Sequence, residues 1–90
     1  MKLNDAPLQE PLSTEVEIYL LEAILKDIVN ELRRATIKHG PFPSDRHGHS
    51  VIEEEFDEFW ETVKFGTLEE QRIECIQISA MAIRFLMDVK

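Results

Sequence analysis

The stretch that decides the fold is TLEEQRIECIQISAMAIRFLMDV, residues 67–89. It opens with Thr67 and carries Glu70 three positions later, which is the spacing of a helix capping box. At about 100° per residue, the apolar side chains of this helix fall on two faces. The first face holds Ile73, Ile76, Ala80, Ile83 and Met87. The second face holds Cys75, Ile78, Ala82, Phe85 and Val89, and a narrow stripe between the two holds Glu74, Gln77, Met81, Arg84 and Asp88.

A helix that is apolar on two sides must be covered on two sides. The chain has 90 residues, which leaves room for only a few other elements to cover it. We therefore expect the first face to pack within the chain. The second face, with Ile78, Phe85 and Val89, is expected to meet a second copy in a homodimer or a dimer of dimers. One broad face that buries everything within the monomer is the alternative.

A first helix is predicted over about residues 14–38. Its apolar side chains recur on one face, at Leu21, Leu25, Ile28, Leu32 and Ala35. Thr14 with Glu17 fits a capping box at its start. The run Gly40-Pro41-Phe42-Pro43 ends it, because glycine and proline do not continue a helix.

A second helix is predicted over residues 48–65, after a short connection. Ser50 and Glu53 form a plausible cap, and Gly66 ends the helix. One face of it holds Ile52, Phe56, Phe59 and Val63. With no run of alternating apolar and polar residues anywhere, the fold class is all-α: a three-helix protomer, about 14–38, 48–65 and 67–89, that completes a helical bundle by homo-oligomerisation.

Composition narrows the possible partners. The formal net charge of −8 argues against a nucleic-acid polymer, because phosphate backbones are bound by Lys and Arg. No stretch reaches the ~20 apolar residues that span a bilayer, so a cytoplasmic protein without a membrane partner is expected. Residues 1–12 predict a flexible arm before a single domain over 13–90, and Cys75 is expected to be a buried thiol.

An acid-rich segment carries the candidate chemistry. Residues 53–58 contain five acids, of which Glu55 and Glu58 lie one helical turn apart on one face. Glu74 and Gln77 repeat that spacing on the following helix. Two facing helices that each offer oxygen ligands make a site inside a helical bundle, and all-oxygen ligation suits Mg²⁺ or Mn²⁺ rather than zinc. A solvated acidic face, favoured by the helix dipole, is the alternative.

These residues resemble a known signature. Glu54-Glu55-x-x-Glu58, a gap of fifteen residues and Glu74-x-x-Gln77 are similar to the EExxE…ExxD pattern of the MazG-like, all-α nucleotide pyrophosphohydrolases. The segments HGPFPS (39–44), GHSVI (48–52) and ECIQISAMAIRF (74–85) resemble a short, often phage-borne branch of that family. The resemblance covers roughly residues 37 to 88.

The resemblance implies hydrolysis of a nucleoside triphosphate between its α- and β-phosphates, with Mg²⁺ as cofactor. By position, Glu55, Glu58 and Glu74 match metal-binding carboxylates, and Glu54 matches an auxiliary ligand or water-orienting base. Gln77 departs from the pattern, because the family has Asp there. A neutral amide oxygen still ligates a hard cation but adds no charge, which puts full catalytic competence in question.

Substrate contacts are expected from cations and aromatic side chains. The cations near enough in sequence to help with phosphate charge are Lys38, Arg46, Lys64 and Arg84. For Arg84, an ion pair with Asp88 is an equal alternative. Phe42 and Trp60 are the candidates for stacking on the base, although aromatics at helical spacing are usually core. A non-catalytic nucleotide-binding or interaction module with the same fold competes with the enzyme.

Overall fold

The computed structural model describes residues 13–90 as three helices, with no strand in that range: α1 (Thr14–His39), α2 (Asp45–Phe65) and α3 (Leu68–Asp88). The all-α prediction is therefore confirmed. The expected arm at residues 1–12 lies outside the described residues. None of the three helices combines the length and apolar character needed to cross a membrane.

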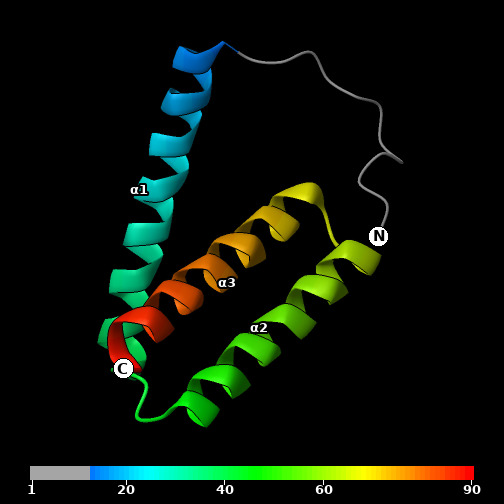
Figure 1. Ribbon diagram of the computed structural model, residues 1–90. Coiled ribbons are helices and arrows are strands. Elements are labelled where there is room, and N and C mark those ends of the chain that lie inside the picture. Colours follow the sequence, from blue (N-terminus) through cyan, green and yellow to red (C-terminus); the bar gives the residue numbers. More distant parts are fainter. Residues whose placement is uncertain (1–12) are drawn as a thin grey trace.

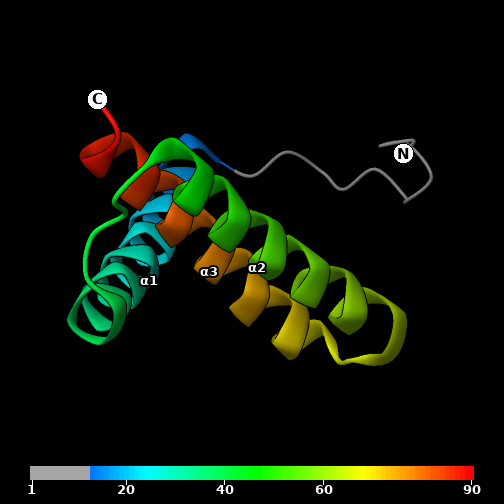
Figure 2. The same ribbon diagram turned by 90° about the horizontal axis from the view of Figure 1, so that it is seen from below.

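The central element is α3, which packs against both α1 and α2 (Figures 1 and 2). The α2 and α3 helices form an antiparallel hairpin, and α1 crosses α3 near the C-terminal ends of both. Each apolar face of α3 is therefore covered in part within the chain, and Ile73, Cys75, Ala82 and Met87 remain exposed. Phe85 and Val89 of the second face pack partly against the chain's own core, and the contact of this face with a second copy stays a prediction.

Serine and threonine side chains begin all three helices. Thr67 and Glu70 form the predicted capping box of α3. The cap of α1 is Ser13, whose hydroxyl accepts a hydrogen bond from the Val16 N–H, and not Thr14. The helix ends as predicted at Gly40, which adopts a φ of 73° that favours glycine.

The second helix starts three residues earlier than predicted. Ser44 caps it by accepting from the His47 N–H at 3.1 Å, so Ser50 lies inside the helix. Gly48 was predicted to lie in the connection before the helix. It lies inside α2 instead, and tertiary packing explains why this position is a glycine. A Cβ on Gly48 would lie 2.6 Å from a Phe85 ring carbon and 2.9 Å from one of Phe42. The first turn of α2 approaches the core closely because this position has no side chain.

The core is small and lies where α1, the connection and α3 meet. Its buried members are Ile28, Ala35, Phe42, Ala80 and Met81. Of the residues predicted to share a face in α1, Leu21 and Leu25 stay exposed; the same holds for Phe56 and Val63 in α2. Cys75 is also exposed, contrary to prediction, because it lies on the side of α3 that neither α1 nor α2 covers.

Candidate functional site

Three carboxylates from two helices converge as the spacing predicted. Glu55 and Glu58 come from α2 and Glu74 from α3, and each offers an oxygen within 4.8 Å of those of the other two. The hairpin brings them together, because it places the middle of α2 beside the first half of α3. The stripe between the two apolar faces of α3 is turned inward, because its residues from Glu74 to Asp88 are all buried or partly buried.

The convergence has an electrostatic cost that appears in the pKa values. Burial, together with the charges of Glu58, Glu74 and Glu54, raises the pKa of Glu55 from 4.5 to about 7. Burial also raises the pKa of Glu74, with Glu58 as the next cause. Like charges held together in this way are relieved by a proton or by a cation.

Gln77 lies between two of the acids. When its amide nitrogen faces them, the nitrogen donates hydrogen bonds to Glu74 Oε2 at 2.8 Å and to Glu55 Oε2 at 3.0 Å. The opposite orientation of the amide presents its oxygen to the same place. Gln77 therefore has two uses here: it bridges the carboxylates through its nitrogen, or it adds a neutral oxygen ligand to them.

A cleft of about 570 Å³ opens beside the acids, between α1, the 40–44 connection and the hairpin. Glu54, Glu55 and Glu58 line one side of it. Arg34 and Lys38 of α1 line another, so the cleft carries both signs of charge. A cleft with carboxylates on one wall and cations on another suits a polyphosphate accompanied by a divalent ion.

Sequence reasoning missed two residues of this cleft, Glu31 and Arg34. Arg34 donates to both oxygens of Glu31, at 2.8 and 2.6 Å, and this contact raises the pKa of the guanidinium. In the sequence, their spacing is that of an ordinary i, i+3 ion pair on the surface of a helix. Only the crossing of α1 over α3 places them opposite the acids.

Arg84 makes the ion pair that was its alternative role. Its Nε donates to Asp88 Oδ2 at 2.6 Å and its Nη1 donates to the Thr36 hydroxyl at 2.6 Å. The Phe42 N–H donates to the same Asp88 oxygen at 2.8 Å. These contacts tie α1, the connection and α3 together. Arg84 also lines the cleft, so a contact with substrate phosphate remains a prediction.

Of the other residues predicted to contact the substrate, Phe42 lies at the cleft, and Trp60 and Lys64 do not. Phe42 lines the cleft but is buried in the core, which leaves little of its ring for stacking. Trp60 lies about 200° around α2 from Glu58, on the opposite side of the helix. Lys64 lies with it, 5.6 Å from the centre of the Trp60 ring and 3.1 Å from a Glu61 oxygen. The structure does not bring Trp60 and Lys64 to the cleft.

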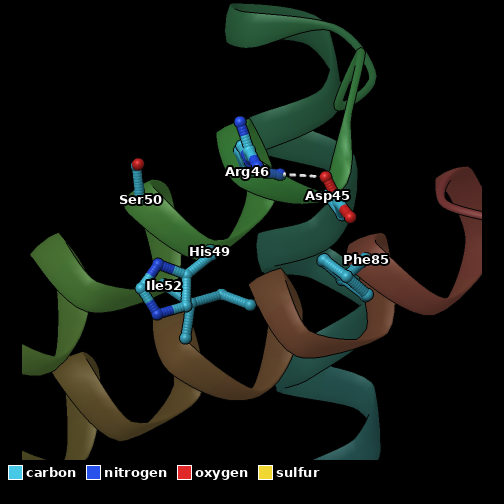
Figure 3. Close-up of a pocket in the computed structure, with 6 residues that line it drawn as sticks. All are labelled: Asp45, Arg46, His49, Ser50, Ile52 and Phe85. Carbon is cyan, nitrogen blue, oxygen red and sulfur yellow. Dashed lines mark hydrogen bonds between the residues drawn. The ribbon is translucent and has the colours of Figure 1, made fainter.

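A second hollow, of about 640 Å³, lies at the first turns of α2 (Figure 3). His49 and Ser50 line it from α2, and Phe85 reaches it from α3. Within residues 13–90, the group of acids able to hold a metal is the one at Glu55, Glu58 and Glu74, and none of these lines this hollow. Although it is larger, it lacks the converging carboxylates that distinguish the cleft.

The chain matches no protein-family model, no curated protein and no solved structure. The resemblance to MazG-like pyrophosphohydrolases thus rests on the sequence motifs, and the structure adds the convergence of their acids beside a cleft.

Proposed function

We propose that this chain is a Mg²⁺-dependent nucleoside triphosphate pyrophosphohydrolase, which releases the monophosphate and pyrophosphate. The observation that carries the proposal is the approach of Glu55, Glu58 and Glu74 to within 4.8 Å of one another, with Glu55 and Glu58 also lining a cleft. The resemblance of the same residues to the MazG-like signature supports it.

The residues fit a magnesium ion by their chemistry. Three carboxylates and one amide oxygen are hard ligands, and two of the acids have raised pKa values that a cation would lower again. Glu55, Glu58, Glu74 and the Gln77 oxygen would hold the ion; Mn²⁺ has the same ligand preferences. Such an ion supplies Lewis acidity toward phosphate oxygens and toward water.

The remaining residues of the cleft have roles that follow from their charge. Lys38 and Arg34 line the α1 side of the cleft, where Arg34 is paired with Glu31, and both would bind the negative phosphate chain. Glu54 is exposed on the acidic wall and would orient the attacking water and accept its proton. Positioning and electrostatic stabilisation would account for most of the catalysis.

The proposal includes the setting in which the chain acts. Its substrate is a (d)NTP of the cytoplasm, and its macromolecular partner is a second copy of itself, as a homodimer or a dimer of dimers. Five buried hydrophobic residues are a small core for the described chain, which supports self-association.

A second candidate function is a nucleotide-binding module without catalysis, and Gln77 favours it. The amide leaves the cluster one charge short of the MazG-like pattern and bridges Glu55 and Glu74 by itself. This module would bind a nucleotide in the same cleft and leave it intact.

One experiment separates the two functions. The purified chain is incubated with each common NTP and dNTP plus Mg²⁺, pyrophosphate release is measured, and binding is followed by calorimetry. We expect release that needs Mg²⁺ and falls at least about 100-fold in Glu58→Gln. The matched control is Glu53→Gln, an exposed α2 carboxylate outside the cleft. Binding without release supports the module, and neither binding nor release contradicts both functions.

A further inference from the structure

Glu31 and Arg34 form an ion pair on the flank of α1 that lines the cleft. Ile28 and Ala35, three positions before and four positions after Glu31, are buried in the core, which fixes this part of α1 against α3. The Glu31 side chain is only 15% exposed, whereas the Arg34 side chain is 54% exposed. The carboxylate therefore lies inside the fold, and the guanidinium lies at the cleft.

The hydrogen bonds of this pair fix the plane of the guanidinium. The Arg34 Nε donates to Glu31 Oε2 at 2.8 Å and its Nη2 donates to Oε1 at 2.6 Å, so one edge of the planar group is held at two points. Within residues 13–90, the third nitrogen of Arg34, Nη1, makes no hydrogen bond. Its two N–H groups are free to bond an acceptor in the cleft, and phosphate oxygens are acceptors that arginine binds well.

Glu31 lies close enough to the acid cluster to repel it. Burial is the first cause of the raised pKa of Glu74, Glu58 is the next, and the charge of Glu31 is the third. Glu31 also contributes to the raised pKa of Glu55, after burial and three other acids. It does not belong to the group of described acids whose oxygens lie close enough together to hold one ion. A carboxylate with this electrostatic cost is explained by its bonds to Arg34, its ion-pair partner among the described residues.

Without the bonds to Glu31, the Arg34 side chain would have a second space to occupy. A smaller hollow of about 320 Å³ adjoins the cleft and shares Glu31, Arg34 and Gln77 with it. Asp27 also lines this hollow, and its carboxylate would attract a guanidinium that is free to turn. Because a free arginine side chain has many conformations, its charge alone does not keep it at the cleft.

We propose that Glu31 is a positioning residue, which holds Arg34 with its Nη1 toward the cleft so that it binds the phosphate chain of a nucleotide. This role rests on the proposed function, because it needs a phosphate chain in the cleft. The gain in affinity comes from preorganisation, since the long side chain is ordered when the protein folds and not when the nucleotide binds. Lys38 lines the same cleft and differs from Arg34 in carrying its charge on a flexible stem.

Nucleotide binding by the full chain, measured by calorimetry, tests this role. The probes are the α,β-methylene analogues of ATP, GTP, CTP and UTP with Mg²⁺, which cannot be split between the α- and β-phosphates. Glu31→Gln is expected to raise the Kd of the best-bound analogue about tenfold, because Arg34 is then free to turn. Loss of a negative charge would by itself favour an anion, so this direction identifies orientation as the cause. Glu61→Gln is the matched control and should leave the Kd unchanged, because Glu61 forms an i, i+3 pair with Lys64 outside the cleft.

A double-mutant cycle separates positioning from a purely structural role. Arg34→Ala is expected to raise the Kd about 30-fold, and Glu31→Gln should cause no further loss in that background, because Glu31 acts through Arg34. Arg34→Lys keeps the charge without the planar fork and should bind as weakly as Glu31→Gln. Wild-type affinity in Glu31→Gln or in Arg34→Lys, or an equal loss from Glu31→Gln in both backgrounds, overturns the positioning role alone. A wild type that binds none of the four analogues overturns the proposed function and this role with it.

Discussion

The two ends of this bundle are built differently. At one end, here called the closed end, the C-terminus of α1, the connection, the start of α2 and the last turn of α3 meet. Gly48 there brings α2 against Phe85, and Asp88 bonds both Arg84 and the Phe42 backbone. At the other, the open end, residues 14–27 of α1 and the turn between α2 and α3 expose Tyr19 and Leu68.

The two ends differ in how much of their surface packs against other segments of the same chain. The closed end is held by contacts between residues more than forty positions apart, such as Arg84 with Thr36. At the open end the helices are capped, but few side chains of other segments pack against them. The acids Glu55 and Glu74 lie between the two ends, where the packing of α2 on α3 brings them together.

The largest effect on stability is expected from Gly48→Val. A side chain there meets Phe85 and Phe42 at less than van der Waals distance, and overpacking of this kind costs about 3 kcal/mol. Thermal unfolding measures it, with Ala82→Val on the exposed side of α3 as control. An unchanged Tm in Gly48→Val would mean that the closed end is looser than described.

A smaller loss is expected from Asp88→Asn. The Arg84 hydrogen bond, with the Phe42 N–H as a further cause, lowers the pKa of Asp88 below its usual 3.8. The stability it adds is therefore present above that value and disappears as the pH falls through the lowered pKa. Tm should fall at neutral pH and much less in acid.

The control for Asp88→Asn is an ion pair at the open end. Lys64→Gln breaks the exposed pair with Glu61 and should leave Tm nearly unchanged, because such pairs contribute little. An equal decrease in Tm in Asp88→Asn and Lys64→Gln would show that the ion pairs at the two ends contribute equally to stability.

A pH effect of opposite sign is expected from Glu55. Its pKa of about 7 lies above its usual 4.5, so the folded chain binds an extra proton between those values and loses stability as the pH rises through them. Without metal, Tm should be higher near pH 5.5 than near pH 8. Glu55→Gln should flatten this slope, and Mg²⁺ should raise Tm at the higher pH. An unchanged slope in the variant would show that the acids are not held together.

Among the variants of the acid cluster, the smallest effect on stability is expected from Gln77→Asp. It replaces a bridging amide by a fourth charge, so the metal-free protein should be slightly less stable and metal affinity about tenfold tighter. Calorimetry with Mg²⁺ and pyrophosphate release measure affinity and turnover separately. Tighter metal with faster turnover would identify Gln77 as a weakened ligand. Tighter metal with slower turnover would identify a role toward substrate, and no change in either would place Gln77 outside the ligand set.

Local signals in the sequence predicted the helices and the acid cluster. Thr67 with Glu70 and the glycines at 40 and 66 mark helix ends through short-range hydrogen bonds. The i, i+3 spacing of Glu55 and Glu58 places them on one face of any helix, and the hairpin follows from a short turn between two helices. These features depend on neighbours within a few residues, which is why the sequence alone was sufficient for them.

Tertiary structure alone decided the rest. Gly48 lies inside α2, where it approaches Phe85, and no local rule reports that contact. The crossing of α1 over α3 placed Arg34 opposite the acids and left Leu21 uncovered. Helical periodicity shows which side chains share a face but not what covers it. The crossing is set by packing between segments distant in sequence, and that packing decides both the wall of the cleft and the surface left open.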